Sequence, residues 1–185
     1  MKFFNVSLLG LRGRHHPAVG NINETSQVIN MRPHLKMLTG DYLTYEKKSQ
    51  QSGGMPHCRI CISGESESLV HVIGCCLALS EPRNRIMSEI DQLCQFNGFL
   101  MRDYYANPEE LTQFILDPSS MNLSKRIHIN DPILPELFKL SRDLCNAIHK
   151  LRMRLIQNKN TWRKHIIYPY YIYYISTIIK IFWSR

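Results

Sequence analysis

The chain has 185 residues, 44% of them hydrophobic and 21% charged, which allows one domain with extended arms. These values exclude a large multidomain enzyme, compositional disorder and a wholly membrane-embedded protein. The net charge of +8 is uneven, because residues 1–57 carry seven basic against three acidic residues, residues 58–138 six against eleven, and residues 139–185 ten against one.

The first third of the chain is predicted to hold a loose arm, a helix and a polar loop. Residues 1–23 show no sustained period and contain three glycines and one proline, which favours a flexible basic arm. Residues 24–39 have apolar side chains at helical spacing, and Pro33 should start a new helix or kink this one. Gly40 supplies a helix stop, and the polar residues 46–56 predict a loop.

Two helix starts marked by proline follow the cysteine-rich segment. Ser80 or Glu81 can cap a helix that has Pro82 in its first turn, and Asn107 can cap another that has Pro108 at its first position. Pro118 should end the second helix. Buried faces are expected at Ile86, Ile90, Leu93 and Phe96 in the first helix, and at Leu111, Phe114 and Ile115 in the second.

The longest predicted helix opens at Asp131-Pro132 and has a stripe of leucine and isoleucine over residues 137–155. Such a stripe is typical of a core face, although it can instead dock a helical protein partner. Basic residues on the other faces would let the helix lie on nucleic acid. The docking alternative would use Leu137, Leu144 and Leu151.

Residues 158–185 differ in character from the rest of the chain. A basic linker leads to an apolar aromatic run at 166–183, which is just long enough to reach across a bilayer. Its unpatterned residue types, with Pro169 and Lys180 inside, favour an unstructured added segment unrelated to the domain. A role in membrane binding is therefore not expected.

The chain has no recognisable secretory signal, because the short apolar stretch at 3–11 is followed by Arg12 and Arg14 and not by a cleavage site. We expect an intracellular protein, cytoplasmic or nuclear, in which clustered cysteines are metal ligands or free thiols. Four of the six cysteines fall within nineteen residues, and the full set is Cys58, Cys61, Cys75, Cys76, Cys94 and Cys145.

The pattern Cys58-x2-Cys61-x9-His71-x4-Cys76 offers three thiols and an imidazole as two close pairs. This donor set suits tetrahedral Zn²⁺. Because four protein ligands leave no open position, such a zinc ion would be structural and not catalytic. His57, next to Cys58, is an alternative donor.

The spacing alone does not decide whether Cys75 or Cys76 is the fourth metal ligand. A helix over 66–75 would place His71 and Cys75 on one face and turn Cys76 away. A left-handed turn at Gly74 would instead let Cys76 swing back to the metal.

Four segments around the cluster keep a recognisable order and spacing: residues 35–43, 58–61, 67–76 and 143–150. Together with a helix that carries Arg83 and Arg85, they resemble the C-terminal zinc-binding region of non-LTR, LINE-type retrotransposon reverse transcriptases. The resemblance covers roughly residues 28–156 and implies a truncated piece of such a polyprotein.

Two positions differ from the usual residues of that family without removing a ligand, namely Leu77 in place of proline and Ser68 in place of threonine. The resemblance favours Cys76 over Cys75 as the last ligand. The ligand set that it implies is Cys58, Cys61, His71 and Cys76.

The sequence contains no constellation of catalytic residues, so we expect no enzymatic activity. Polymerases need carboxylates clustered around two Mg²⁺ ions, whereas the aspartates of this chain are isolated. Phosphate-loop, serine hydrolase and zinc protease motifs are also missing. The six aspartates are Asp41, Asp91, Asp103, Asp117, Asp131 and Asp143.

The expected fold is mainly α: a small zinc-knuckle-stapled helical domain over 24–157, with its knuckle at 57–79, between the flexible arm and the hydrophobic tail. The basic ends favour binding of RNA or DNA through phosphates, although solvated helix faces give the same excess of charge. Alternatives are a zinc-stabilised protein-interaction module and a non-functional retroelement remnant. Expected nucleic-acid contacts are Lys47, Lys48, Arg59, Arg83, Arg85, Lys150, Arg152 and Arg154.

Overall fold

The computed structural model describes the backbone of residues 25–61, 63–98, 101, 105–121 and 132–183, and the side chains of these residues up to 158, except those of 120 and 121. This part of the chain is mainly helical and has no β-strand, and one antiparallel bridge pairs His57 with Ser66. The predicted mainly α fold is confirmed. The predicted arm at 1–23 lies outside the described residues.

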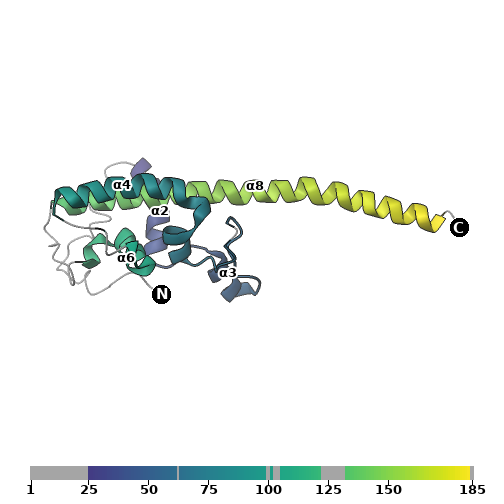
Figure 1. The fold of residues 1–185 in the computed structure, drawn as a ribbon, viewed down its shortest axis with the longest axis horizontal. Helices are drawn as coiled ribbons and strands as arrows, with labels where there is room; N and C mark the ends of the chain where they lie inside the picture. Colours follow the sequence, from purple (N-terminus) through teal and green to yellow (C-terminus); the bar gives the residue numbers. More distant parts are fainter. Residues whose placement is uncertain (1–24, 62, 99–100, 102–104, 122–131, 184–185) are drawn as a thin grey trace.

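The long helix α8, Ile133–Trp183, organises the domain. Helices α2 (Thr25–Leu38) and α4 (Ser80–Phe96) pack against α8, and α6 (Pro108–Leu116) packs against the segment that carries the cysteines. Figure 1 shows α4 alongside α8, whose C-terminal part extends past the other helices. The shorter elements are α3 (Tyr45–Ser52), the π turn η1 (His71–Cys75) and the 3₁₀ turns η2 (Leu77–Leu79) and η3 (Pro118–Met121).

The leucine stripe of α8 faces the core of its own domain. Leu137, Leu144 and Ile148 are fully buried, and Leu151 is half-buried against the same core. Removal of these apolar side chains from water is the main force that holds α8 against α2 and α4. The core interpretation is confirmed. The docking alternative is wrong for Leu137 and Leu144, which no partner can reach.

Helix α6 begins at the predicted signal. The Asn107 side chain accepts hydrogen bonds from the backbone N–H groups of Glu109 (3.0 Å) and Glu110 (3.3 Å). Pro108 has no N–H to satisfy, and its fixed φ suits the first helical position. The helix ends at Leu116, two residues before Pro118, as predicted. The predicted inner face is buried at Leu111, Phe114 and Ile115.

Helix α2 continues through Pro33, so the new helix start predicted at this residue is wrong. The proline removes one backbone hydrogen bond from the helix. Its ring is buried, and removal of apolar surface from water is a favourable contribution that acts against this loss. Gly40 ends the helix as predicted, with a left-handed φ of 75°.

The predicted loop at 46–56 begins as a helix instead, α3. The Thr44 side chain accepts a hydrogen bond from the backbone N–H of Lys47 (3.2 Å), and Glu46 lies in the first turn, where a carboxylate suits the helix dipole. Polar composition does not oppose a helix, and the first residue that does is Gly53, which follows the last turn with a φ of 70°.

Helix α4 differs from its prediction at both ends. Ser80 is a helical residue and not a side-chain cap, because the 3₁₀ turn η2 leads directly into α4. Ile86 and Ile90 are buried as expected, and Leu93 is half-buried against the core. Phe96 is wrongly predicted, since this last residue of the helix is 93% exposed.

The backbone of α8 is helical to Trp183, where the sequence predicts an unstructured tail from residue 158. The tail has no glycine, and it continues a helix that is already anchored in the core, so each further residue except Pro169 can add a hydrogen bond without a new nucleation step. In the described part of the chain, no helix is long and apolar enough to span a bilayer. Side chains beyond residue 158 lie outside the described set, so the role of the run at 166–183 stays a prediction.

Candidate metal centre

Cys58 and Cys61 lie on a tight loop that backbone hydrogen bonds close. The N–H of Cys58 donates to the carbonyl of Glu65 (2.8 Å), and the N–H of Glu67 donates to the carbonyl of Pro56 (2.8 Å). Gly64 allows the chain to reverse, because its φ of 72° is left-handed. The loop therefore presents both thiols of the Cys-x2-Cys pair to the segment that follows.

A π turn brings the second pair of donors together. The N–H of Cys76 donates to the carbonyl of His71 (2.7 Å), which closes the turn over five residues. An α-helix closes over four residues, so the wider turn is what brings His71 and Cys76 to the same side. Gly74 lies inside this turn without a left-handed φ, so the left-handed turn predicted there is wrong.

The structure brings together the four predicted donors Cys58, Cys61, His71 and Cys76, whose ligand atoms all lie within 4.8 Å of one another. The Sγ atoms of Cys58 and Cys76 are 3.9 Å apart, and Cys61 Sγ lies 3.3 Å from His71 Nε2. Three of the four side chains are buried, and Cys61 is half-buried. This cluster can hold a metal ion.

The alternative donors are not part of the cluster. Cys75 is half-buried and its ligand atom is not within the convergent set, whereas Cys76 is 0% exposed and is a member. His57 is exposed and is likewise outside the set. Of the two thiols that the sequence left open as the last donor, the structure therefore places Cys76, and not Cys75, in the cluster with His71.

Glu65 orients the histidine of the cluster. One of its carboxylate oxygens lies 2.8 Å from His71 Nδ1, while the other ring nitrogen, Nε2, faces Cys61. A carboxylate at Nδ1 fixes the tautomer that leaves Nε2 free to bind a metal, and it makes that nitrogen a stronger ligand. Sequence analysis did not predict this role of Glu65. A carboxylate six residues before a predicted histidine ligand could have suggested it.

The three thiols differ in how readily they ionise. Burial, and after it the neighbouring Cys58 and Cys61, raise the pKa of Cys76 to about 12. Burial also raises the pKa of Cys58. Partial burial acts in the same direction on Cys61, but hydrogen bonds from Ser63, Cys58 and His71 outweigh it and lower the pKa of Cys61 to about 6. A divalent cation in the cluster would favour the thiolate form of all three.

A buried ion pair joins the cluster to α8. Arg152 donates from Nε (3.1 Å) and Nη2 (2.8 Å) to the two carboxylate oxygens of Glu67, which is 0% exposed. Glu67 also accepts from the N–H of Tyr45 (2.7 Å), and its carboxylate lies 3.9 Å from Cys58 Sγ. Arg152 is only 6% exposed. Its predicted role as a nucleic-acid contact is therefore wrong, because this charge is already bound inside the fold.

Arg83 is also internal, and the prediction that it contacts nucleic acid is wrong. Its guanidinium donates to the carbonyls of Ile73 (3.1 Å) and Cys76 (2.8 Å) and is 8% exposed. The Ile73 carbonyl lies in the π turn, and the Cys76 carbonyl follows the turn and also accepts from the N–H of Leu79 (3.1 Å). Arg83 therefore ties α4 to the π turn and to the residue that follows it.

Two other predicted contacts are partly engaged within the domain. Lys47 is half-buried, donates to the carbonyl of Gly40 and lies 3.7 Å from the Asp41 carboxylate. The Arg59 guanidinium lies 4.6 Å from the centroid of the Tyr45 ring. Both side chains contribute positive charge close to the surface but are already held by neighbours.

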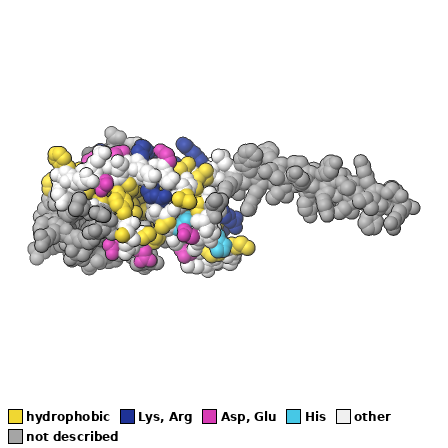
Figure 2. Space-filling model, viewed as in Figure 1, with side chains coloured by type: hydrophobic (Ala, Val, Ile, Leu, Met, Phe, Trp, Pro, Cys, Tyr) yellow, Lys and Arg dark blue, Asp and Glu magenta, His cyan; other side chains and the backbone are white. Residues whose placement is uncertain are grey.

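The remaining predicted contacts are exposed. Arg85 lies 3.7 Å from Glu81 across one helical turn. On the face shown in Figure 2, basic and acidic side chains are interspersed and do not form one large charged field. The exposed residues of the predicted set are Lys48, Arg59, Arg85, Lys150 and Arg154, of which Arg59 is the one held against Tyr45.

Comparison of the chain with protein-family models, curated proteins and solved structures finds no match. The resemblance to non-LTR reverse transcriptases stays an expectation based on sequence motifs, whereas the convergence of the four donors is an observation of the structure.

Replacing Arg152 by Met should destabilise the domain by about 3–5 kcal/mol, because the Glu67 carboxylate would stay buried without its partner. The double variant Glu67→Gln with Arg152→Met should recover part of this loss. Arg154→Met, which changes an exposed arginine in the same helix, is the matched control and should stay within about 0.5 kcal/mol of the parent. Urea unfolding followed by helicity measures all three, and equal losses for the two arginine variants would contradict the buried pair.

Proposed function

We propose that this chain is a zinc-stabilised helical module that binds RNA or DNA. The zinc centre is supported by the convergence of Cys58, Cys61, His71 and Cys76. Three thiols and one imidazole are the donors that tetrahedral Zn²⁺ prefers. With Zn–S bonds of ~2.3 Å, neighbouring sulfurs of a tetrahedral site are about 3.8 Å apart, which is close to the 3.9 Å between the Cys58 and Cys76 sulfurs.

In this proposal the zinc is structural, because its four protein ligands leave no position for a reacting water molecule. Cys58 and Cys61 would bind from the loop, and His71 and Cys76 from the π turn. The ion would supply a link between these two segments, so its binding free energy would add to the stability of the fold. Glu65 would keep the imidazole of His71 in the binding tautomer.

The nucleic-acid part of the proposal is supported by exposed basic side chains and by the resemblance to the zinc-binding region of non-LTR reverse transcriptases. Lys48, Lys150 and Arg154 remain on the surface with charges available to phosphates. Isolated aspartates give no polymerase centre, so the proposed role is binding without catalysis. The burial of Leu137 and Leu144 in the core favours this function over the protein-interaction alternative, which would use both side chains in its docking face.

The purified full chain should bind one zinc ion, and Cys61→Ser and His71→Ala should each abolish stoichiometric binding with loss of helicity. Cys75→Ser is the matched control, since this neighbouring thiol is outside the cluster, and it should keep both zinc and helicity. Metal analysis and circular dichroism during chelation measure these properties. Retention of zinc by Cys61→Ser, or its absence from the parent chain, would refute the zinc centre.

Zinc affinity should rise with pH between about 6 and 8. Burial and neighbouring thiols raise the pKa of Cys76 to about 12, and burial raises that of Cys58, so both hold protons in this range. These two thiols must each lose a proton to bind as thiolates, whereas Cys61, with a pKa of about 6, is half ionised at the lower end of this range and largely ionised at the upper end. Competition with a chromogenic chelator at several pH values measures the slope, and a pH-independent affinity would contradict this account.

Binding of the zinc-loaded chain to oligonucleotides should weaken steeply with salt, because phosphate contacts release condensed counterions. We expect at least about a tenfold loss of affinity between about 50 and 200 mM salt. Fluorescence anisotropy with labelled RNA and DNA measures it. Absence of binding at low salt, or an affinity unchanged by salt, would count against the nucleic-acid function while leaving the zinc centre standing.

A further inference from the structure

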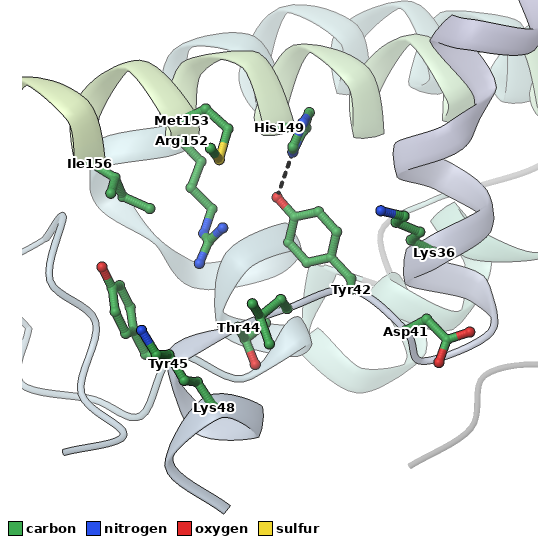
Figure 3. Close-up of a pocket in the computed structure, with 11 residues that line it drawn as sticks. Lys36, Asp41, Tyr42, Thr44, Tyr45, Lys48, His149, Arg152, Met153 and Ile156 are labelled. Atoms are coloured by element: carbon green, nitrogen blue, oxygen red, sulfur yellow. Dashed lines mark hydrogen bonds between the residues drawn. The ribbon is translucent and has the colours of Figure 1, made fainter. Parts of the chain in front are cut away.

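Two adjoining cavities lie where the end of α2 and the segment after it meet α8. Their volumes are about 270 Å³ and 390 Å³, and Lys36, Tyr42 and His149 line both. We name the joined cavities the Tyr42 groove. In Figure 3 the Tyr42 ring points from the segment after α2 toward His149 on α8, with Lys36 on one side and Arg152 on the other.

Most lysine and arginine side chains that line the Tyr42 groove have no carboxylate partner within the described residues, and the exception is Arg152, which binds Glu67. Four of its basic side chains are exposed and form no ion pair within the described residues. They come from α2, α3 and α8, so they surround the groove and do not form a row on one helix. These cations are Arg32, Lys36, Lys48 and Lys150.

Acidic side chains do not balance this charge. Among the described residues that line the groove, the only carboxylate is Asp41, which lies 3.7 Å from Lys47 outside it. The positive surroundings also act on His149, whose pKa is lowered by burial and then by Arg152 and Lys36. The groove therefore suits an anionic ligand.

The Tyr42 side chain at the base of the groove is held by a hydrogen bond, and exposed apolar side chains lie next to it. The Tyr42 hydroxyl is hydrogen-bonded to His149 Nδ1 (3.1 Å), and Tyr42 is only 6% exposed. Three large apolar side chains of the lining are exposed to solvent instead of packing in the core: Ile29 at 55%, Leu43 at 54% and Met153 at 38%. A ligand that combines negative charge with flat apolar groups would cover both kinds of surface.

We propose that the Tyr42 groove binds single-stranded nucleic acid, with phosphates on its exposed cations and a base in the recess against Leu43 and Met153. This inference rests on the proposed nucleic-acid function and adds the site and the form of the strand. A recess accepts an unstacked base, whereas the bases of a duplex keep their faces covered by neighbouring pairs. An acidic peptide would satisfy the cations but offers no regular series of flat groups.

The test compares two double variants of the full zinc-loaded chain. Lys36→Gln with Lys150→Gln removes two cations of the groove, and Lys139→Gln with Arg142→Gln removes two cations of α8 outside it. The probe is a labelled single strand of about 15 nucleotides, as RNA and as DNA. Each phosphate contact contributes about 0.7 to the slope of log affinity against log salt. The groove variant should therefore lower the slope by about 1.4, and the control variant should leave it unchanged.

The other outcomes distinguish a failure of the groove assignment from a failure of the proposed nucleic-acid function. If both variants lower the slope equally, the groove assignment is overturned and the nucleic-acid function stands. If the parent chain binds no strand at low salt, the proposed function itself fails. A duplex that binds as tightly as the single strand, or polyglutamate that competes as well as an unlabelled strand, also overturns the assignment. Circular dichroism confirms that both variants keep the parent helicity.

Discussion

The buried ion pair between Glu67 and Arg152 is the contact on which the arrangement of this domain depends. It joins the segment of the metal cluster to α8 across 85 positions of sequence. Burying either charge alone would cost several kcal/mol, so the fold requires both side chains in one geometry. The N–H of Tyr45 gives the carboxylate a third donor. A pair satisfied in this way fixes how the cysteine loop lies on α8, which apolar contacts alone would leave less defined.

A second arginine, on a different helix, also supports the cluster. Arg83 binds the carbonyls of Ile73 and Cys76, while Arg152 binds the carboxylate beside Cys58. The two halves of the donor set are therefore held by different helices, α4 and α8. A metal ion bound by the four donors would link the segments that these two helices hold.

Features set by near neighbours could be predicted from the sequence, and features set by distant partners could not. The Cys-x2-Cys pair and the cap at Asn107 depend on a few adjacent residues, and the structure places both as expected. Local sequence patterns predict Arg83 and Arg152 as surface cations, because the groups that accept their hydrogen bonds lie in other elements of the fold. Phe96 fits the helical period but lies where the core has ended. The π turn could not be predicted either, because the spacing of apolar residues does not distinguish it from an α-helix.

The metal cluster and the Tyr42 groove share a continuous run of contacts. Cys58 Sγ lies 3.9 Å from the Glu67 carboxylate, and Arg152, which binds that carboxylate, has its guanidinium 5.4 Å from the centroid of the Tyr42 ring. The Tyr42 hydroxyl then meets His149 on α8 (3.1 Å). Contact alone does not make the two sites allosteric, since coupling needs an element with two arrangements that both sites bias. The two sites nevertheless share Arg152 as a supporting residue. A substitution that removes its guanidinium deprives Glu67, beside the cluster, of its charge partner and Tyr42, in the groove, of a ring contact.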